Sequence, residues 1–300
     1  MLRDRNWARL HGIAADFANK TNGVFYGVIG ALDGLALRIT SPTLNEVAVP
    51  GNFYCRKGFF ALNVQAICDR QKRFLWCYPM NKGSTHDSAA FGGSQLIELL
   101  KELAPELEQQ GLFLVGDAAY ALASYMMVPY DKTELDDDPL KIRDSFNYYL
   151  SACRIFIECA FGELVMRWGM FWRTMRFSSL KKTGRVIQAT MLLHNFIVDE
   201  RAITVNNSDE CAFFANFDMQ ENSSYQVRIT NETLETPIPL VTDNNEPKPL
   251  GRPHKHEELS RRHGYQLRAS MTLALSAHNL SRPLETGMKY NKYGNIYMTY

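Results

Sequence analysis

The sequence lacks the features that mark secreted, zinc-binding and membrane-spanning proteins. Only six cysteines occur in 300 residues, and they form neither a CxxC pair nor a close cluster. This spacing argues against a zinc knuckle and a disulfide scaffold, and it indicates reduced thiols inside a cell. No apolar run approaches the roughly 18 residues of a transmembrane helix, and the first residues, MLRDRNWARLHG, lack the apolar stretch of a signal peptide. We therefore expect a soluble intracellular protein that does not enter a membrane.

A strong charge excess is also absent, since 33 basic and 32 acidic residues give a net charge of +1. The charges are nevertheless distributed unevenly along the chain. Residues 1–73 contain ten Lys and Arg against five Asp and Glu, and residues 154–185 contain seven against two. Basic zones of this size are able to meet phosphate groups, although an ordinary solvated surface gives the same pattern.

The composition changes along the chain and predicts three segments. Hydrophobic residues make up 46% and charged residues 22%, which are globular values. After Arg201, Asn, Ser, Glu and Thr dominate, which is typical of a flexible linker. We expect an N-terminal helical remnant over 1–22, one α/β domain over 23–201, and a largely flexible tail over 202–300 with one further helix at 255–280.

Hydrophobic patterning predicts the order β-β-β-α-β-α-α within the central segment. Four stretches rich in β-branched and aromatic residues favour strands, namely Gly23–Thr40, Phe59–Asp69, Arg73–Met80 and Gly111–Asp117, of which the second and third form a hairpin. Helices are predicted over Ser88–Glu102, which Pro105 ends or kinks, and over Lys141–Trp168 and Leu180–Arg201. This order suits an α/β domain with a mixed sheet, and it is the order of the RNase H-like fold.

Three acids stand at positions where metal ligands occur. Asp33 interrupts an otherwise apolar strand, where a carboxylate is costly unless it is paired or binds a cation. The Asp-Gly pair at 33–34 equally fits a hairpin turn, so both interpretations of Asp33 stay open. Asp117 ends a strand, at the edge where ligands of α/β sheets gather, but a single acid there is more simply explained as a turn cap.

The third acid, Glu158, lies on the predicted helix Lys141–Trp168. Helical geometry places Glu158 about 100° from the centre of the apolar face of that helix. An ordinary i,i+4 ion pair with Arg154 accounts for Glu158 just as well. Taken together, however, carboxylates from three different elements fit phosphodiester hydrolysis with two divalent ions, and oxygen-only ligands point to Mg²⁺ or Mn²⁺.

Five ordered motifs resemble those of the Harbinger-type DDE transposases and the nucleases derived from them. The similarity runs from about Gly27 to Glu200. It rests on ALDG with LALRI, NFYCRKGFFALNVQAICD with GSTHDS further along, VGDAAYAL with Val128-Pro129-Tyr130, FNYYLSACRIFIECAFGELVMRW, and LLHNF. The resemblance implies an RNase H-like catalytic core with a mixed five-stranded sheet flanked by helices. It also implies that Asp33 bridges two metal ions whose shells Asp117 and Glu158 complete.

The resemblance and the local sequence together suggest several accessory residues. Asp87 matches a family acid and is either a fourth ligand or, as we favour, the N-cap of the following helix. Arg154 is a candidate for contacting phosphate or holding Glu158, and Lys57 is a candidate for contacting DNA. His86 is more simply a structural loop residue than a proton shuttle. His194 is interpreted as a core histidine with satisfied hydrogen bonds.

The expected function is that of a metal-dependent DNA endonuclease or transposase in the nucleus. Relatives usually carry a longer helical region with helix-turn-helix character before the first acid, whereas 32 residues precede Asp33 here. A separate DNA-binding partner protein and a homo-oligomer are therefore included among the expected assemblies. The alternatives are a domesticated, catalytically silent scaffold that binds DNA or a partner, and a two-metal phosphatase of small phosphoesters, which would not need the basic zones.

Overall fold

The computed structural model describes residues 2–19, 23–138, 140–204, 255–282, 288–290 and 296–298. In chain order the elements are α1 (Trp7–Ala18), β1 (Val28–Arg38), η1 (Pro50–Phe53), β2 (Ala61–Cys68), β3 (Phe74–Lys82), α2 (Asp87–Gly92), α3 (Gln95–Glu102), α4 (Ala104–Gln110), β4 (Phe113–Val115), β5 (Met126–Met127), α5 (Lys132–Asp136), α6 (Ile142–Arg167), η2 (Gly169–Trp172), α7 (Leu180–Thr204), α9 (Lys255–Ala277), β6 (Met288–Tyr290) and β7 (Ile296–Met298). Of the helices described, none is both long enough and apolar enough to cross a membrane.

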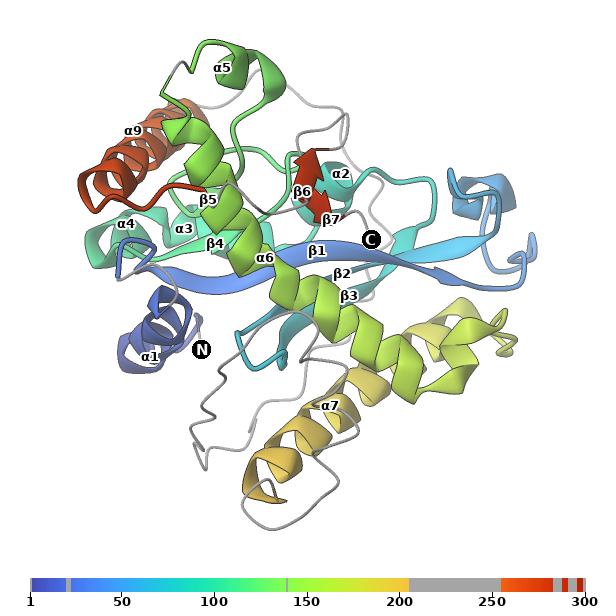
Figure 1. Ribbon diagram of the computed structural model, residues 1–300. Helices are drawn as coiled ribbons and strands as arrows, with labels where there is room; N and C mark the ends of the chain where they lie inside the picture. The colour runs from blue at the N-terminus through green and yellow to red at the C-terminus, as the bar shows by residue number, and fades with distance from the viewer. Residues whose placement is uncertain are drawn as a thin grey trace.

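A five-stranded mixed sheet in the order β3-β2-β1-β4-β5 forms the centre of the molecule. The first three strands are antiparallel neighbours, whereas β4 and β5 run parallel to β1. The long helix α6 crosses in front of the strands, and α1 and α7 lie along the lower side of the view in Figure 1. The α/β class and the five-stranded mixed sheet of an RNase H-like core are thus confirmed.

The central strand β1 is continuous through the Asp33-Gly34 pair, so the hairpin-turn interpretation of these residues is wrong. Asp33 lies opposite Ala66 of β2, and Gly34 lies opposite Gln65. Every residue of β2 is buried, because helices cover both faces of the sheet at that strand. Asp33 therefore occupies the middle of a covered sheet, where a carboxylate needs a specific reason to be present.

A glycine just before β1 allows the chain to approach the start of β4. Gly27 has a φ of +115°, and a Cβ at this position would lie 2.0 Å from the carbonyl oxygen of Gly111. Only glycine tolerates both the left-handed backbone and this close approach. The contact sets β1 beside β4, and the Phe113 N–H donates to the Gly27 carbonyl at 2.8 Å.

Two details of the helices and strands differ from the sequence prediction. The helix expected over Ser88–Glu102 is divided into α2 and α3, because the Gly92-Gly93 pair disfavours a helix interior. Pro105 lies in the first turn of α4, where its missing N–H costs no hydrogen bond. Strand β5 has two residues and carries no alternating pattern, so the sequence does not predict a strand there.

Two asparagines attach helices to backbone at the two edges of the sheet. The Asn195 side chain on α7 accepts from the Phe74 N–H at 2.7 Å and donates to the Phe74 carbonyl at 2.8 Å. Asn147 on α6 makes the same pair of bonds with Tyr130, at 2.8 and 2.9 Å. Each carboxamide thereby satisfies both backbone groups of one buried residue, which fixes α7 to the start of β3 and α6 to the segment after β5.

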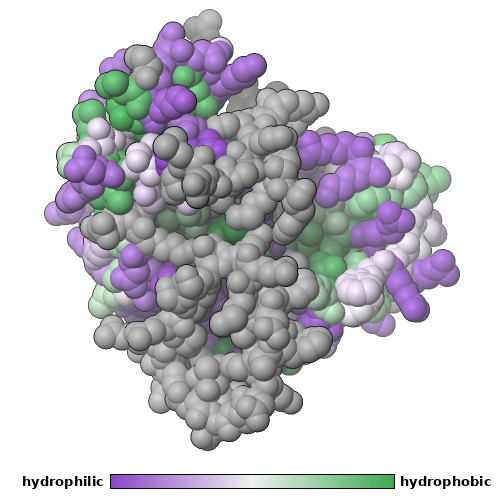
Figure 2. All heavy atoms as spheres, in the orientation of Figure 1, coloured by the Kyte–Doolittle hydropathy of each residue, from purple (hydrophilic) through white to green (hydrophobic). Residues whose placement is uncertain are grey.

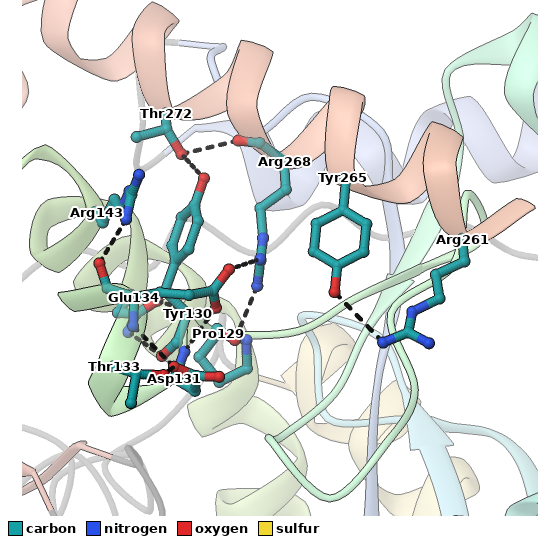
Figure 3. A network of polar contacts seen from close by, with 11 residues as sticks. Pro129, Tyr130, Asp131, Thr133, Glu134, Arg143, Arg261, Tyr265, Arg268 and Thr272 are labelled. Atoms are coloured by element: carbon teal, nitrogen blue, oxygen red, sulfur yellow. Dashed lines mark hydrogen bonds and ion pairs between the residues drawn. The ribbon is translucent and has the colours of Figure 1, made fainter. Parts of the chain in front are cut away.

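The helix at Lys255–Ala277, where the sequence suggested one at 255–280, packs on the core around a buried arginine (Figure 3). The Arg268 guanidinium lies over the Tyr130 ring, 3.9 Å from its centroid, and pairs with Glu134 of α5. Arg268 Nη1 donates to the Pro129 carbonyl at 3.2 Å, and the Tyr130 hydroxyl lies 3.0 Å from Thr272 Oγ1. This network joins α9 to the chain that follows β5.

Apolar contacts reinforce this attachment of α9. Met271 and Leu275 are buried in the same core as the sheet, and α9 contacts both α6 and β5. Within the third segment, α9 therefore packs on the core. Most of 202–254, where the linker was expected, lies outside the described residues, and the division into three segments stays a prediction.

Replacing Arg268 with alanine is expected to loosen α9. The change removes hydrogen bonds of a buried cation and its stacking on Tyr130, which corresponds to a loss of about 2–3 kcal/mol. Hydrogen exchange should show faster exchange of the α9 amides, together with a lower Tm. The control is Arg262→Ala on the same helix, whose ion pair with Glu258 is exposed; equal exchange in the two variants would contradict the prediction.

Candidate active site

Asp33 and Asp117 lie on neighbouring parallel strands at matching positions. Ala31 of β1 is paired with Val115 of β4, and the two acids follow those residues by two positions each. Neighbouring strands are about 4.8 Å apart, so the register brings the two carboxylates to one place beyond the carboxyl end of β4. Each acid also accepts a local backbone N–H: Gly34 donates to Asp33 at 2.7 Å, and Ala119 donates to Asp117 at 2.9 Å.

Helix α6 carries Arg154 and Glu158 to the same region, one turn apart. Arg154 Nη2 lies 3.3 Å from Glu158 Oε1, so the expected i,i+4 contact is present. The Arg154 side chain is 6% exposed and the Glu158 side chain 55% exposed, and a half-exposed pair of this kind contributes little stability. Arg154 Nε is moreover a buried donor without a hydrogen-bond partner in the described structure. A buried donor that the protein leaves unsatisfied calls for a functional explanation.

The electrostatics of Asp33 link these four residues into one site. Burial raises the pKa of Asp33, and the charges of Asp117 and Glu158 raise it further, whereas Arg154 and the Gly34 N–H lower it. The resulting pKa is about 7. A carboxylic acid whose pKa is held near neutrality mainly by burial, with two further carboxylates close by, is typical of a functional site.

A second polar group lies at the same level of the sheet and centres on Asp87. Asp87 Oδ1 accepts from Asn63 Nδ2 at 2.8 Å and from Gln65 Nε2 at 3.0 Å. The Tyr120 hydroxyl donates to Gln65 Oε1 at 2.7 Å. Asp87 is the first residue of α2 and the N-cap is His86, without a side-chain cap bond, so the interpretation of Asp87 as an N-cap is wrong. Its carboxylate accepts hydrogen bonds from side chains of β2 and does not cap the helix.

The Asp33 group and the Asp87 group lie on opposite faces of the sheet. Side chains alternate between the faces of a strand, and a Cβ on Gly34 would lie 2.3 Å from Asp87 Oδ1. The face of Gly34 is thus the α2 face, and Asp33 points to the α6 face. Burial raises the pKa of Tyr120, and the charges of Asp33, Asp87 and Asp117 raise it further, which shows that both groups act on one hydroxyl.

The donors fit a hard divalent cation by their chemistry, although they are not gathered around one point. Asp33, Asp117 and Glu158 offer only carboxylate oxygens, the ligands that Mg²⁺ and Mn²⁺ prefer. Across the residues for which positions are described, no group of three or more His, Cys, Asp or Glu side chains is close enough together to hold a metal ion. Each acid is engaged with its local partner, so the structure brings the three together as an electrostatic cluster and not as a ligand set.

The remaining sequence candidates lie outside this cluster. Lys57 is exposed in the turn between Cys55 and Gly58, beyond the far end of β1 and β2. His86 is exposed, and its Nδ1 lies 3.0 Å from Ser88 Oγ. His194 is fully buried, with Nε2 3.0 Å from the Lys72 carbonyl and Nδ1 3.2 Å from Arg167 Nη1. The interpretation of His194 as a core residue is confirmed.

Sequence reasoning missed Asn63, Gln65 and Tyr120. Two polar residues at alternate positions of β2 are a recognisable signal, because they share one face of an otherwise apolar strand. Tyr120 carried no such signal, because its partner Gln65 is 55 residues away in the sequence and only the fold brings the two together.

Comparison with known proteins places the chain in a family. The model of the family described as DDE superfamily endonuclease matches residues 32–195. A protein of Arabidopsis thaliana, "Protein ALP1-like", is 26% identical over 185 residues, which are 57% of this chain and 44% of the relative. The chain therefore spans less than half the length of that relative. No solved structure matches the chain.

Replacing Gly34 with alanine is expected to disrupt the Asp87 group. The added methyl group would lie within 2.5 Å of both Asp87 Oδ1 and Gln65 Nε2, so one buried hydrogen bond or more must break, at a cost of about 1–3 kcal/mol each. Denaturant unfolding should give a lower midpoint. The control is Gly12→Ala in α1, where nothing lies within 4 Å of the new Cβ and a gain of up to about 1 kcal/mol is expected. A Gly34→Ala protein as stable as the wild type would refute the packing described.

His194 is expected to make the protein less stable below neutral pH. Burial lowers the pKa of His194 from 6.5 to about 4, so the unfolded chain binds a proton between these values while the folded chain does not. Stability is thus fully present above about pH 6.5 and falls by up to roughly 3 kcal/mol as the pH approaches 4. Unfolding of His194→Gln should vary less with pH than unfolding of the wild type or of the exposed-site control His86→Gln. Parallel pH profiles for all three proteins would show that His194 is not the group responsible.

Proposed function

Because this chain belongs to the DDE superfamily of endonucleases, we propose that it hydrolyses phosphodiester bonds of DNA at the site formed by Asp33, Asp117 and Glu158. One observation above all supports the proposal. A carboxylate with a pKa near 7 in the central strand stands beside two further acids and a buried arginine donor that has no partner among the described residues. A structural ion pair would explain Arg154 and Glu158, but it would not explain why Asp33 is placed at the same point.

Asp33, Asp117 and Glu158 are the residues that would hold two divalent ions, Mg²⁺ or Mn²⁺. When bound, such ions supply a nucleophilic water and stabilise the leaving oxygen. Asp33 and Asp117 are already adjacent through strand register. Glu158 has a half-exposed side chain and a weak partner, so a change of rotamer toward Asp33 is inexpensive.

Arg154 and the Asp87 group have separate roles in this proposal. Once Glu158 turns toward the acids, Arg154 Nη2 is released and can donate to a phosphate oxygen. Asp87 is a positioning residue instead of a fourth ligand, because it supports Gly34 from the opposite face of the sheet. Lys57 is a further candidate for contact with DNA, through the surface described in the next subsection.

Hydrolysis at this site leaves a 3′-hydroxyl, and a transposase reaction would use that hydroxyl to attack target DNA. We place the protein in the nucleus on the strength of its expected substrate. A separate DNA-binding partner protein and a homo-oligomer are further parts of the proposal. None of these assemblies is needed for the hydrolytic step itself.

The second candidate function is a catalytically silent scaffold that binds DNA or a partner. The observation that favours it is the absence, among the described residues, of any group of three acids gathered closely enough to hold a metal ion. A scaffold retains the fold and its stabilising polar groups but does not need Glu158 to approach Asp33. Metal binding therefore separates the two functions.

Purified protein with Mg²⁺ or Mn²⁺ is expected to nick supercoiled plasmid DNA, and Asp33→Asn is expected to reduce the rate by at least about 100-fold, because one oxygen ligand becomes an amide. The matched control is Asp16→Asn, which makes the same exchange at an acid of α1 that accepts a hydrogen bond from Gln71 and belongs to neither polar group of the site. Titration of Mn²⁺ into each protein should release heat for the wild type and the control only. Equal nicking by the wild type and Asp33→Asn would rule out the nuclease, and folded wild-type protein without Mn²⁺ heat would support the scaffold.

A further inference from the structure

Nine basic side chains from four segments meet at the end of the molecule where β1 finishes. They are Arg38, Arg56, Lys57, Lys82, Arg173, Arg176, Lys181, Lys182 and Arg185, and we call this surface the basic end. All of these side chains are exposed except that of Lys82, which is half-buried. In Figure 1 this end lies to the right, and Figure 2 shows hydrophilic side chains projecting there between hydrophobic ones.

Backbone contacts hold these segments together. The Met175 N–H donates to the Arg38 carbonyl at 3.0 Å, and the Thr40 N–H donates to the Met175 carbonyl at 3.1 Å. These bonds fix Arg173 and Arg176 beside the last residue of β1. The Arg38 guanidinium lies 4.2 Å from the centre of the Phe59 ring, which places it against the turn that carries Arg56 and Lys57.

The start of α7 completes the basic end from the side of β3. A Cβ on Gly184 would lie 2.4 Å from Met80 Sδ, so this turn of α7 is in direct contact with β3. Lys181, Lys182 and Arg185 surround that contact along the helix, and Lys82 follows Met80 by two residues. The four segments therefore form one surface and are not scattered patches.

The basic side chains of the basic end are not paired with acids in the part of the chain that the structure describes. The stretches 38–62, 78–86 and 169–185 contain one acid, Glu46. Its two carboxylate oxygens accept from the Thr43 N–H and the Leu180 N–H, at 3.1 and 3.0 Å, and these bonds help to lower its pKa. No basic side chain of this surface forms an ion pair within the described residues. A concentration of unpaired cations is costly by mutual repulsion unless a polyanion binds there.

We infer that the basic end binds the phosphate backbone of the DNA duplex on one side of the cleavage point. Asp33 and Arg38 are five residues apart on one strand, which corresponds to about 17 Å. Phosphates of one DNA strand advance about 3.4 Å along the axis per nucleotide. Measured along the strand, the basic end thus begins about five base pairs from the candidate site, and a duplex that contacts both must pass around the end of β1, because Asp33 and Arg38 point to opposite faces of that strand. This inference rests on the proposed nuclease function for its orientation, but the binding itself does not require cleavage.

The test compares the salt dependence of DNA binding without divalent ions, using a fluorescent 20-base-pair duplex. The variants are Arg56→Gln with Lys57→Gln, Lys181→Gln with Lys182→Gln, and the combination of all four. The control is Lys132→Gln with Arg262→Gln, which removes two exposed cations from α5 and α9 at the other end of the molecule. Unchanged circular dichroism spectra and Tm values establish that each variant is folded.

Each lost phosphate contact is expected to reduce the slope of log affinity against log salt by about 0.9. Each double variant should therefore lose up to about 1.8 and the fourfold variant up to about 3.6, while the control keeps the slope of the wild type. A fourfold variant with the wild-type slope, a control that loses as much, or a wild type that does not bind the duplex would each overturn the inference. Plasmid nicking by the wild type separates the two proposals. A reduced slope without nicking supports DNA binding at the basic end and rules out the nuclease. Nicking with an unchanged slope supports the nuclease and rules out DNA binding at the basic end.

Discussion

Burying a carboxylate in the central strand of a sheet is unfavourable, and much of this fold is arranged around the carboxylate of Asp33. The strand on either side of it is fixed by the β2 register and by the close approach of Gly27 to Gly111. The neighbouring residue has no side chain, because Asp87 and Gln65 occupy the space where a Cβ would be. Helix α6 supplies Arg154, whose positive charge offsets part of the cost. A position that harms stability and is nevertheless supported from three directions is typical of a functional site.

The two faces of the sheet carry different polar groups at this point. On the α6 face, the carboxylate of Asp33 lies near those of Asp117 and Glu158 and near the positive charge of Arg154. On the α2 face, Asn63, Gln65, Tyr120 and Asp87 form a group in which each hydrogen bond is made within the protein. The hydrogen bonds of this second group tie β2 to the start of α2, directly behind Gly34 of β1. The cluster is therefore held in place by residues that do not themselves need to contact a substrate.

The sequence predicted the parts of the fold that depend on local pattern. The hairpin of β2 and β3, the strand before Asp117 and the long helices α6 and α7 follow from periodicity and turn residues. The break at Gly92-Gly93 and the two-residue strand β5 were not predicted, since neither changes the periodicity of its surroundings. The membership of the DDE superfamily, anticipated from five motifs, is confirmed by the match over residues 32–195.

The candidate site was predictable only in part, for a physical reason. Asp33, Asp117 and Glu158 could be named because acids are rare in apolar strands and because the motifs resembled a family. Their relation to Gln65 and Tyr120 was not accessible, because those contacts arise from packing between elements distant in the chain. Asp87 shows the same limit: its place before a helix suggested a cap, and tertiary contacts with β2 gave it another partner.

The two asparagines that attach α6 and α7 to the sheet have a consequence for the behaviour of the protein at high concentration. An edge strand offers unpaired N–H and carbonyl groups to which another chain can add. Asn195 occupies both groups of Phe74 at the β3 edge, and Asn147 occupies both groups of Tyr130 just after the β5 edge. Each carboxamide takes the place that an incoming strand would need. The backbone groups of Phe74 and Tyr130 are thereby unavailable to an incoming strand.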